Sequence, residues 1–167
     1  MMTIGHLLTG GLGNFGSGGS PTVINNYITI PAAVAQASII AGQITIVRGD
    51  TLAVALPLMG DISARTKLTF TAKRKEADSD EDAMIQVVEG VGLTRFNGDD
   101  DVTASDASLV VVGATVGHAT LTISGGITAQ LALRDLIWDC QYVTPTQVST
   151  PIGGGLGVVP DVTRATS

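Results

Sequence analysis

Two acidic stretches are the residues whose types and spacing come nearest to a metal site. Asp78-Ser79-Asp80-Glu81-Asp82, with Glu89 at the twelfth position, has the carboxylate spacing of a calcium-binding loop. The sixth position of such a loop needs glycine for its sharp turn, but here it is Ala83, and a strand-like pattern follows. Asp99-Asp100-Asp101 offers too few ligands from one turn. We therefore expect two solvated acidic loops, with an adventitious cation site at either as the alternative.

Groups that could act as nucleophiles or bases are sparse. The chain has two histidines, His6 in a glycine-rich stretch and His118 in a predicted turn, which do not make a catalytic triad or a metal site. The single cysteine, Cys140, cannot form an internal disulfide, and its apolar surroundings predict a small buried hydrophobe. Paired carboxylates of a hydrolase are not excluded by spacing, but aromatic residues that would hold a sugar make up only 4% of the chain. We predict a protein that is not an enzyme and needs no cofactor.

A literal match to the dinucleotide fingerprint G-x-G-x-x-G occurs at Gly11-Leu12-Gly13-Asn14-Phe15-Gly16. The fingerprint works only between a strand and a helix, with an acid about 20 residues further on. No core strand precedes it here, Ser, Gly and Pro follow it, and the first acid of the chain is Asp50. The glycines therefore indicate a flexible or assembly-ordered arm.

Arg48-Gly49-Asp50 is the tripeptide that integrins recognise in extracellular ligands. A tight turn between two strands explains the same residues, because glycine adopts a positive φ easily and aspartate hydrogen-bonds the local backbone. We prefer the turn.

The elements that would position these residues are mostly strands. Apolar and polar residues alternate with period two, and turn residues recur every ~8–12 positions, which is typical of a β-sandwich. The predicted strands are residues 43–47, 51–56, 67–73, 84–88, 108–112, 119–124, 136–143 and 146–159. Leu68, Phe70 and Ala72 should face inward in one of them. Leu136, Trp138, Cys140 and Tyr142 should share a face in another, and residues 128–134 should form a helical turn.

Charge divides the chain into two parts. No Lys, Arg, Asp or Glu occurs before Arg48, and the first twenty residues are rich in glycine. A short β-like run, residues 23–30, lies between Pro21 and Pro31. We predict an extended uncharged arm over residues 1–42 and a β-sandwich over residues 43–167. An arm this apolar cannot bury itself, so it should order on a neighbouring subunit. Its assembly contacts are predicted at Leu7, Leu8, Leu12, Phe15, Val23, Ile24, Tyr27 and Ile28.

The bulk properties exclude several partners. The net charge is −6, and the basic cluster Lys73-Arg74-Lys75 is followed at once by acids, which disfavours nucleic acid and anionic membranes. Mean hydropathy is +0.37. However, the most apolar stretch, residues 28–47, is interrupted by proline and polar residues, so we expect no membrane span. The uncharged start lacks the positive region of a secretory signal.

Four motifs in order resemble one family. Arg48-Gly49-Asp50-Thr51 looks like a "basic-Gly-Asp-Thr" turn between a first and second strand, and residues 68–75 look like a central strand before an acidic loop. The run 136–141, with Trp138 and Cys140, and the closing stretch 148–162 complete the set. Together they resemble the immunoglobulin-like module of phage baseplate upper proteins and related tail-appendage proteins. This chain departs from the family at Gly154-Gly155, where one glycine is usual, and at Trp138, where Tyr is common.

The resemblance implies an all-β, immunoglobulin-like β-sandwich and a place in a bacteriophage particle. It implies an adapter or accessory protein of the tail, baseplate or neck, assembled in the bacterial host cytoplasm. Its expected partners are tail, neck, portal or capsid proteins and further copies of itself. One alternative is a capsid decoration or head fibre protein. The other is a carbohydrate-binding adhesion module, for which Trp138 is the best aromatic platform.

Overall fold

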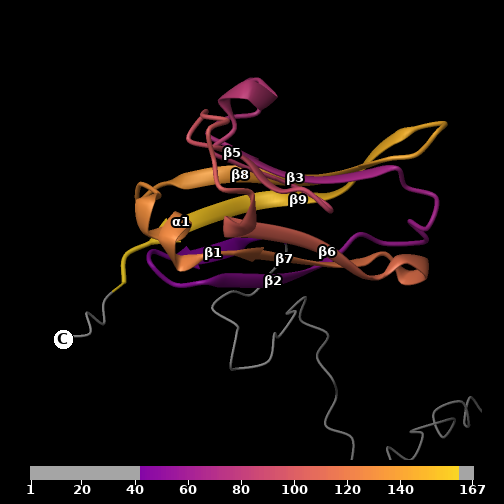
Figure 1. Cartoon of the computed structure of the whole chain (residues 1–167), viewed down its shortest axis with the longest axis horizontal. Coiled ribbons are helices and arrows are strands. Elements are labelled where there is room, and N and C mark those ends of the chain that lie inside the picture. The colour runs from indigo at the N-terminus through magenta and orange to yellow at the C-terminus, as the bar shows by residue number, and fades with distance from the viewer. Residues whose placement is uncertain (1–41, 162–167) are drawn as a thin grey trace, which may run out of the picture.

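The computed structural model describes residues 42–161, whose strands form two facing sheets (Figure 1). The six-stranded sheet contains, in spatial order, β1 (Ile44–Val47), β9 (Val148–Val159), β8 (Asp135–Val143), β3 (Lys67–Lys73), β4 (Ile85–Val88) and β5 (Gly92–Phe96). The three-stranded sheet contains β2 (Leu52–Pro57), β7 (His118–Ile123) and β6 (Ala107–Gly113). The all-β prediction is therefore confirmed.

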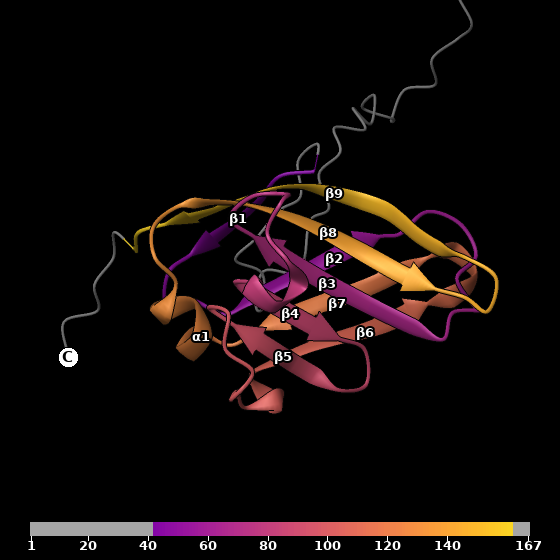
Figure 2. The same ribbon diagram turned by 90° about the horizontal axis from the view of Figure 1, so that it is seen from above.

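Neighbouring strands are antiparallel except at one place. β1 runs parallel to β9, with Ile44 opposite Leu156 and Val47 opposite Val159. The chain then turns at residues 48–51 and enters the other sheet as β2. β1 and β2 thus lie on the same lateral side of the molecule, whereas β5 and β6 lie on the other (Figure 2).

Helical structure is confined to short connections. The only α-helix of residues 42–161 is α1 (Gly125–Gln130), between β7 and β8. Single 3-10 turns occur at Asp80–Asp82, Ala104–Asp106 and Ala114–Val116. None of the helices within the described range is long and apolar enough to cross a membrane.

The core lies between the sheets and is built from alternate residues of each strand. Leu68, Phe70 and Ala72 of β3 are fully buried, as predicted from their spacing. The Phe70 ring stacks on Trp138 of β8, with 5.5 Å between the ring centroids. Tyr142 packs against this core but is only half-buried, near the end of β8.

All eight predicted strands occur, with ends that differ by no more than two residues. The ninth, β5, was not predicted. It is a short strand that begins with a glycine at φ +100°. Its register shifts against β4, and its sequence shows no clean alternation of apolar and polar residues.

The predicted helical turn at residues 128–134 is wrong in its position. The helix begins at Gly125, where the hydroxyl of Ser124 accepts a hydrogen bond from the Ile127 N–H, and it ends at Gln130. The sequence did not predict this start because the first turn contains two glycines, and glycine has a low helix propensity.

The predicted assembly contacts from Leu7 to Ile28 lie outside the described residues, as do the fingerprint match at residues 11–16 and His6. The last six residues of the predicted sandwich, 162–167, lie outside them too.

Candidate interaction surfaces

The point where the predicted arm meets the core is fixed by Trp138. Its side chain is 4% exposed, and its indole N–H donates to the carbonyl oxygens of Gly42, at 3.0 Å, and Gly155, at 2.9 Å. Gly42 lies two residues before the first residue of β1. The first described residue of the chain is thus hydrogen-bonded to the largest aromatic side chain of the core.

The glycines of β9 make room for this approach. A Cβ added at Gly154 would overlap the carbonyl of Gly42, and one added at Gly155 would overlap the Gln43 side chain. Gly153 is close to the Trp138 carbonyl, at 2.8 Å from the position of an added Cβ. The pair Gly154-Gly155, at which the chain departs from the resembled family, therefore lies where β9 contacts the Gly42 backbone and the Gln43 side chain.

The Arg48-Gly49-Asp50-Thr51 segment forms a tight turn between β1 and β2. The Asp50 N–H donates to Val47 O at 3.1 Å, and Gly49 has φ +95°. Asp50 makes both of these turn contacts through its main chain: its N–H donates to Val47 O, and its carbonyl accepts from Thr128 Oγ1. Arg48 and Thr51 are exposed.

A buried hydroxyl from α1 holds this turn. Thr128 is fully buried, and its Oγ1 accepts from the Gly49 N–H at 3.2 Å and donates to Asp50 O at 2.7 Å. A Cβ added at Gly125 would lie 2.5 Å from Gly49 O, so the helix and the turn are in close contact. Thr128 is a structural residue that sequence reasoning missed, since it is 78 positions from Asp50.

A small hollow on the outer face of the six-stranded sheet surrounds Asp139. Its lining includes Thr71, Lys73, Glu76 and Ile137. Partial burial raises the pKa of the Asp139 carboxyl. The positive charge of Lys73 opposes this shift, and the negative charge of Asp80 adds to it. The Lys73 ammonium is itself held by Asp80, at 2.6 Å, and Asp78 O, at 3.0 Å.

Cys140 lies behind this hollow, in the core. It is fully buried, and burial raises the pKa of its thiol to about 12, with a further contribution from the Asp139 charge. The thiol stays protonated at neutral pH and is not a reactive nucleophile there. His118 is exposed at the start of β7.

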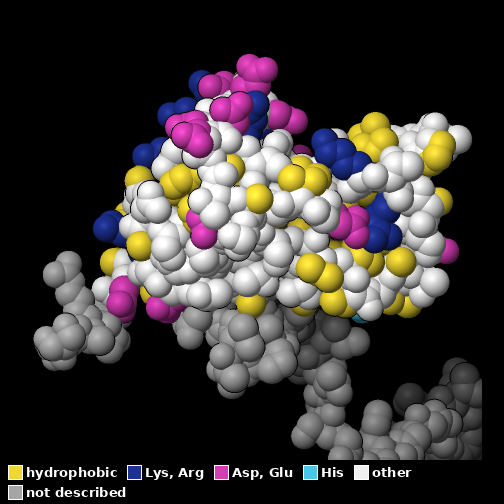
Figure 3. Space-filling model, in the orientation of Figure 1, with side chains coloured by type: hydrophobic (Ala, Val, Ile, Leu, Met, Phe, Trp, Pro, Cys, Tyr) yellow, Lys and Arg dark blue, Asp and Glu magenta, His cyan; other side chains and the backbone are white. Residues whose placement is uncertain are grey.

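The two acidic stretches, which are distant in the sequence, meet at one end of the molecule. Glu81 and Asp82 line a shallow hollow together with Asp99, Asp100 and Arg95. Acidic and basic side chains gather in this part of the surface, at the top of Figure 3. No group of three or more His, Cys, Asp or Glu side chains in residues 42–161 is arranged to hold a metal ion.

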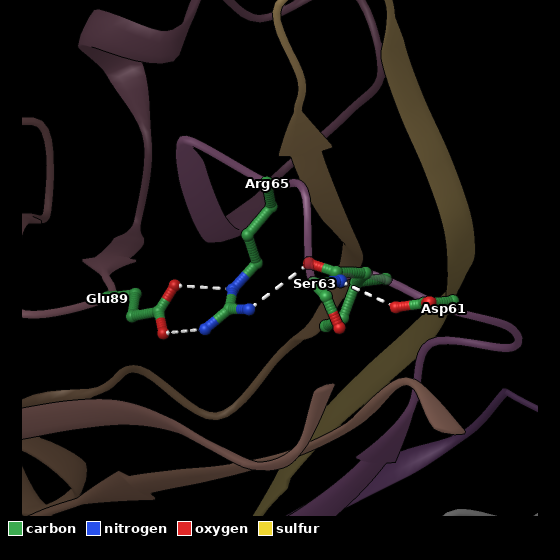
Figure 4. A network of polar contacts seen from close by, with 5 residues as sticks. Asp61, Ser63, Arg65 and Glu89 are labelled. Atoms are coloured by element: carbon green, nitrogen blue, oxygen red, sulfur yellow. Dashed lines mark hydrogen bonds and ion pairs between the residues drawn. The ribbon is translucent and has the colours of Figure 1, made fainter. Parts of the chain in front are cut away.

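A bidentate ion pair ties the β2–β3 connection to the β4–β5 turn (Figure 4). Arg65 Nε donates to Glu89 Oε2 at 2.8 Å, and a second nitrogen binds the other carboxylate oxygen. A third bond runs from Arg65 to Ile62 O at 3.1 Å. The hydrogen bonds with Glu89 raise the pKa of Arg65. Nearby, the Ser63 hydrogen bonds lower the pKa of the exposed Asp61 carboxyl.

Aromatic side chains are not displayed on the surface of the described part of the chain. Phe70, Phe96 and Trp138 are buried, and Tyr142 is half-buried. Trp138 therefore cannot serve as an exposed sugar-binding platform.

No protein-family model and no curated protein matches the chain. Among solved structures, one similar chain is described as the NK cell receptor Nkp44, a triggering partner in natural cytotoxicity. The sequences are 11% identical, the TM-score is 0.44, and the match covers 71% of this chain and 96% of that one.

Proposed function

We propose that this chain is a non-enzymatic structural protein of a bacteriophage virion. It acts as an adapter or accessory protein of the tail, baseplate or neck. Its N-terminal arm packs on neighbouring virion proteins, and its immunoglobulin-like domain is displayed. The observation that carries the proposal is the junction of two unlike parts. The first 47 residues carry no charged side chain, and this stretch enters the β-structure at β1, where Trp138 holds Gly42.

The strand order supports an immunoglobulin-like sandwich of the variable type. In that architecture the sheet with strands G, F and C is extended by two more strands, and a second sheet faces it. β9, β8, β3, β4 and β5 lie in this order, and β2, β7 and β6 face them. Trp138, two residues before Cys140, takes the place of the tyrosine that hydrogen-bonds backbone in such domains.

The first alternative is a capsid decoration or head fibre protein. Such a protein would use the same arm and the same domain and would differ only in its location on the particle. The carbohydrate-binding alternative loses its best residue, because Trp138 is buried. The Arg48-Gly49-Asp50 turn is explained by its contacts with α1 and does not require a receptor.

Deletion of residues 1–36 tests the proposal. Tagged full-length and shortened chains would be expressed in infected cells, and their amounts in purified particles compared by quantitative mass spectrometry. We expect the shortened chain to be lost from particles while its Trp138 fluorescence still reports a folded core. Incorporation at normal occupancy would show that the arm is not the anchor.

A map of the particle separates the adapter from the decoration protein. Cryo-electron microscopy of particles that carry the tagged chain should show a ring of copies at one vertex or along the tail. Copies spread over the whole capsid lattice would contradict the adapter role and favour decoration.

A further inference from the structure

The three-stranded sheet ends at β6, an edge to which no further strand of residues 42–161 is paired. β6 pairs with β7 on one side only, and it is regular from Ala107 to Val111. Its seven residues contain no proline and no charged residue, and Val110 and Val112 are 52% and 67% exposed. Exposed strand edges of this composition attract other strands, and proteins usually protect them with charges, proline or a cover.

The other sheet edges among residues 42–161 have such protection. β1 is only four residues long, β2 ends in Pro57, and β5 carries Arg95 and a register shift against β4. β6 is therefore the edge at which an added strand would gain the most main-chain hydrogen bonds.

A shallow groove runs beside this edge. Residues from the β4–β5 turn form one wall and residues from β6 form the other, and no charged residue lines it. Its lining includes Gly90, Val91, Gly92, Ser108, Leu109 and Val110. The nearest carboxylate on the turn, Glu89, is neutralised by Arg65, so the wall presents an uncharged surface with an exposed Val91.

The sequence outside the described range supplies an occupant of matching chemistry. Residues 23–30 (VINNYITI) carry no charge, alternate in the manner of a strand and are bounded by Pro21 and Pro31, and their length is close to that of β6. Residues 31–41 join this segment to Gly42 and can span up to about 36 Å when extended.

The place of Gly42 favours a segment from another copy. Trp138 holds Gly42 on the β1–β9 side of the molecule, whereas β6 lies on the opposite side with β5 (Figure 2). A segment of the same chain would have to cross the whole three-stranded sheet to reach β6, and a neighbouring copy would not.

We propose that the free edge of β6 and the adjoining groove bind residues 23–30 of a neighbouring copy of this chain, which adds a strand to the three-stranded sheet. This inference rests on the proposed function, since it specifies one of the surfaces on which the arm packs. Each chain donates a strand from its arm to one neighbour and accepts a strand at its own β6 edge.

Disulfide trapping between two full-length variants tests the contact. Chains with Ser108→Cys on β6 and differently tagged chains with Asn25→Cys or Asn26→Cys in the arm would be mixed and oxidised. Adjacent arm positions are needed because successive side chains of a strand point to opposite faces. The native Cys140 is buried and does not compete. The matched control replaces Ser108→Cys by Thr150→Cys, an exposed position on β9.

We expect one of the two arm cysteines to give a mixed disulfide dimer with Ser108→Cys at about tenfold higher yield than with Thr150→Cys, because docking raises the local concentration. Val110→Lys combined with Val112→Lys should abolish this excess, whereas Val148→Lys, at another exposed valine, should not. Equal yields with both acceptors would overturn the proposal. So would a disulfide that forms only within a chain when Ser108→Cys and the arm cysteine are placed in the same molecule.

The outcome is separable from that of the particle experiment. If the arm deletion removes the chain from particles but no excess cross-link forms at β6, the anchoring role stands and this contact is wrong. If the cross-link forms but the shortened chain still enters particles at normal occupancy, the contact is right and the anchoring role is wrong.

Discussion

Trp138 is the residue that connects most parts of this molecule. Its ring stacks on Phe70 in the core, and its N–H binds the carbonyls of Gly42 and Gly155. Its inward orientation could be predicted from the alternation of β8. Its hydrogen bonds could not, because the two carbonyls are 96 and 17 positions away and only the folded backbone brings them to the indole.

Replacement of Trp138 by phenylalanine should destabilise the fold by about 2–3 kcal/mol. The smaller ring leaves a cavity, and two part-buried carbonyls lose their donor. Urea unfolding followed by far-UV circular dichroism measures the loss. Ile137→Val, at the half-exposed neighbouring position on the other face of β8, is the control and should change stability by less than about 1 kcal/mol. If both variants had the same stability, the Trp138 hydrogen bonds would contribute nothing measurable.

The strands were the most predictable elements, because their alternation follows directly from burial on one face. β3 matches its prediction at both ends, since the side chains of Leu68, Phe70 and Ala72 all enter the core. β5 was not predicted, and α1 was predicted at the wrong position. Both elements begin with glycine, which has a low propensity for strand and for helix, so their local sequence signals are weak. Their positions depend on tertiary contacts, such as those that Thr128 makes with the Gly49 turn.

The glycines of β9 allow a sharper test at the scale of one element. Gly154→Ala should cost several kcal/mol, about 3 or more, because its Cβ would overlap the backbone of Gly42, which cannot move without breaking the Trp138 hydrogen bond. Gly126→Ala in α1 is the matched control. Its Cβ meets only Ser124 Oγ at 3.8 Å, so the higher helix propensity of alanine should stabilise the protein by about 0.5–1 kcal/mol. Thermal unfolding of both variants measures the difference, and two equal shifts would contradict the close contact at Gly154.

At the scale of the whole molecule, composition and the two-residue alternation of apolar and polar side chains predicted two β-layers. They did not predict the order of the strands within each layer. The parallel pairing of β1 with β9 joins the first described strand to the last one, and no local pattern encodes it. The predicted arm was located by the absence of charged side chains before Arg48, by its glycines and by the start of the alternating pattern at residue 43. The structure adds the hydrogen bond from Trp138 to Gly42, the last residue of that predicted arm. It also brings the two acidic loops together at one end, a proximity that their spacing in the sequence does not reveal.

That junction leads to a prediction about how the whole molecule unfolds. Both sheets contribute to one continuous cluster of buried side chains, which begins at Ile44 of β1 and includes Trp138. Domains with one core usually unfold in a single cooperative step. We therefore expect the urea midpoint of Trp138 fluorescence to coincide with that of far-UV circular dichroism for the full chain at low concentration.

If the fluorescence changed first, the β1–β9 side would open as a separate unit. A partner pulling on the arm would then detach β1 without unfolding the rest. Coincident transitions instead mean that β1 stays part of the core until the whole domain unfolds, as the proposed anchoring through the arm requires.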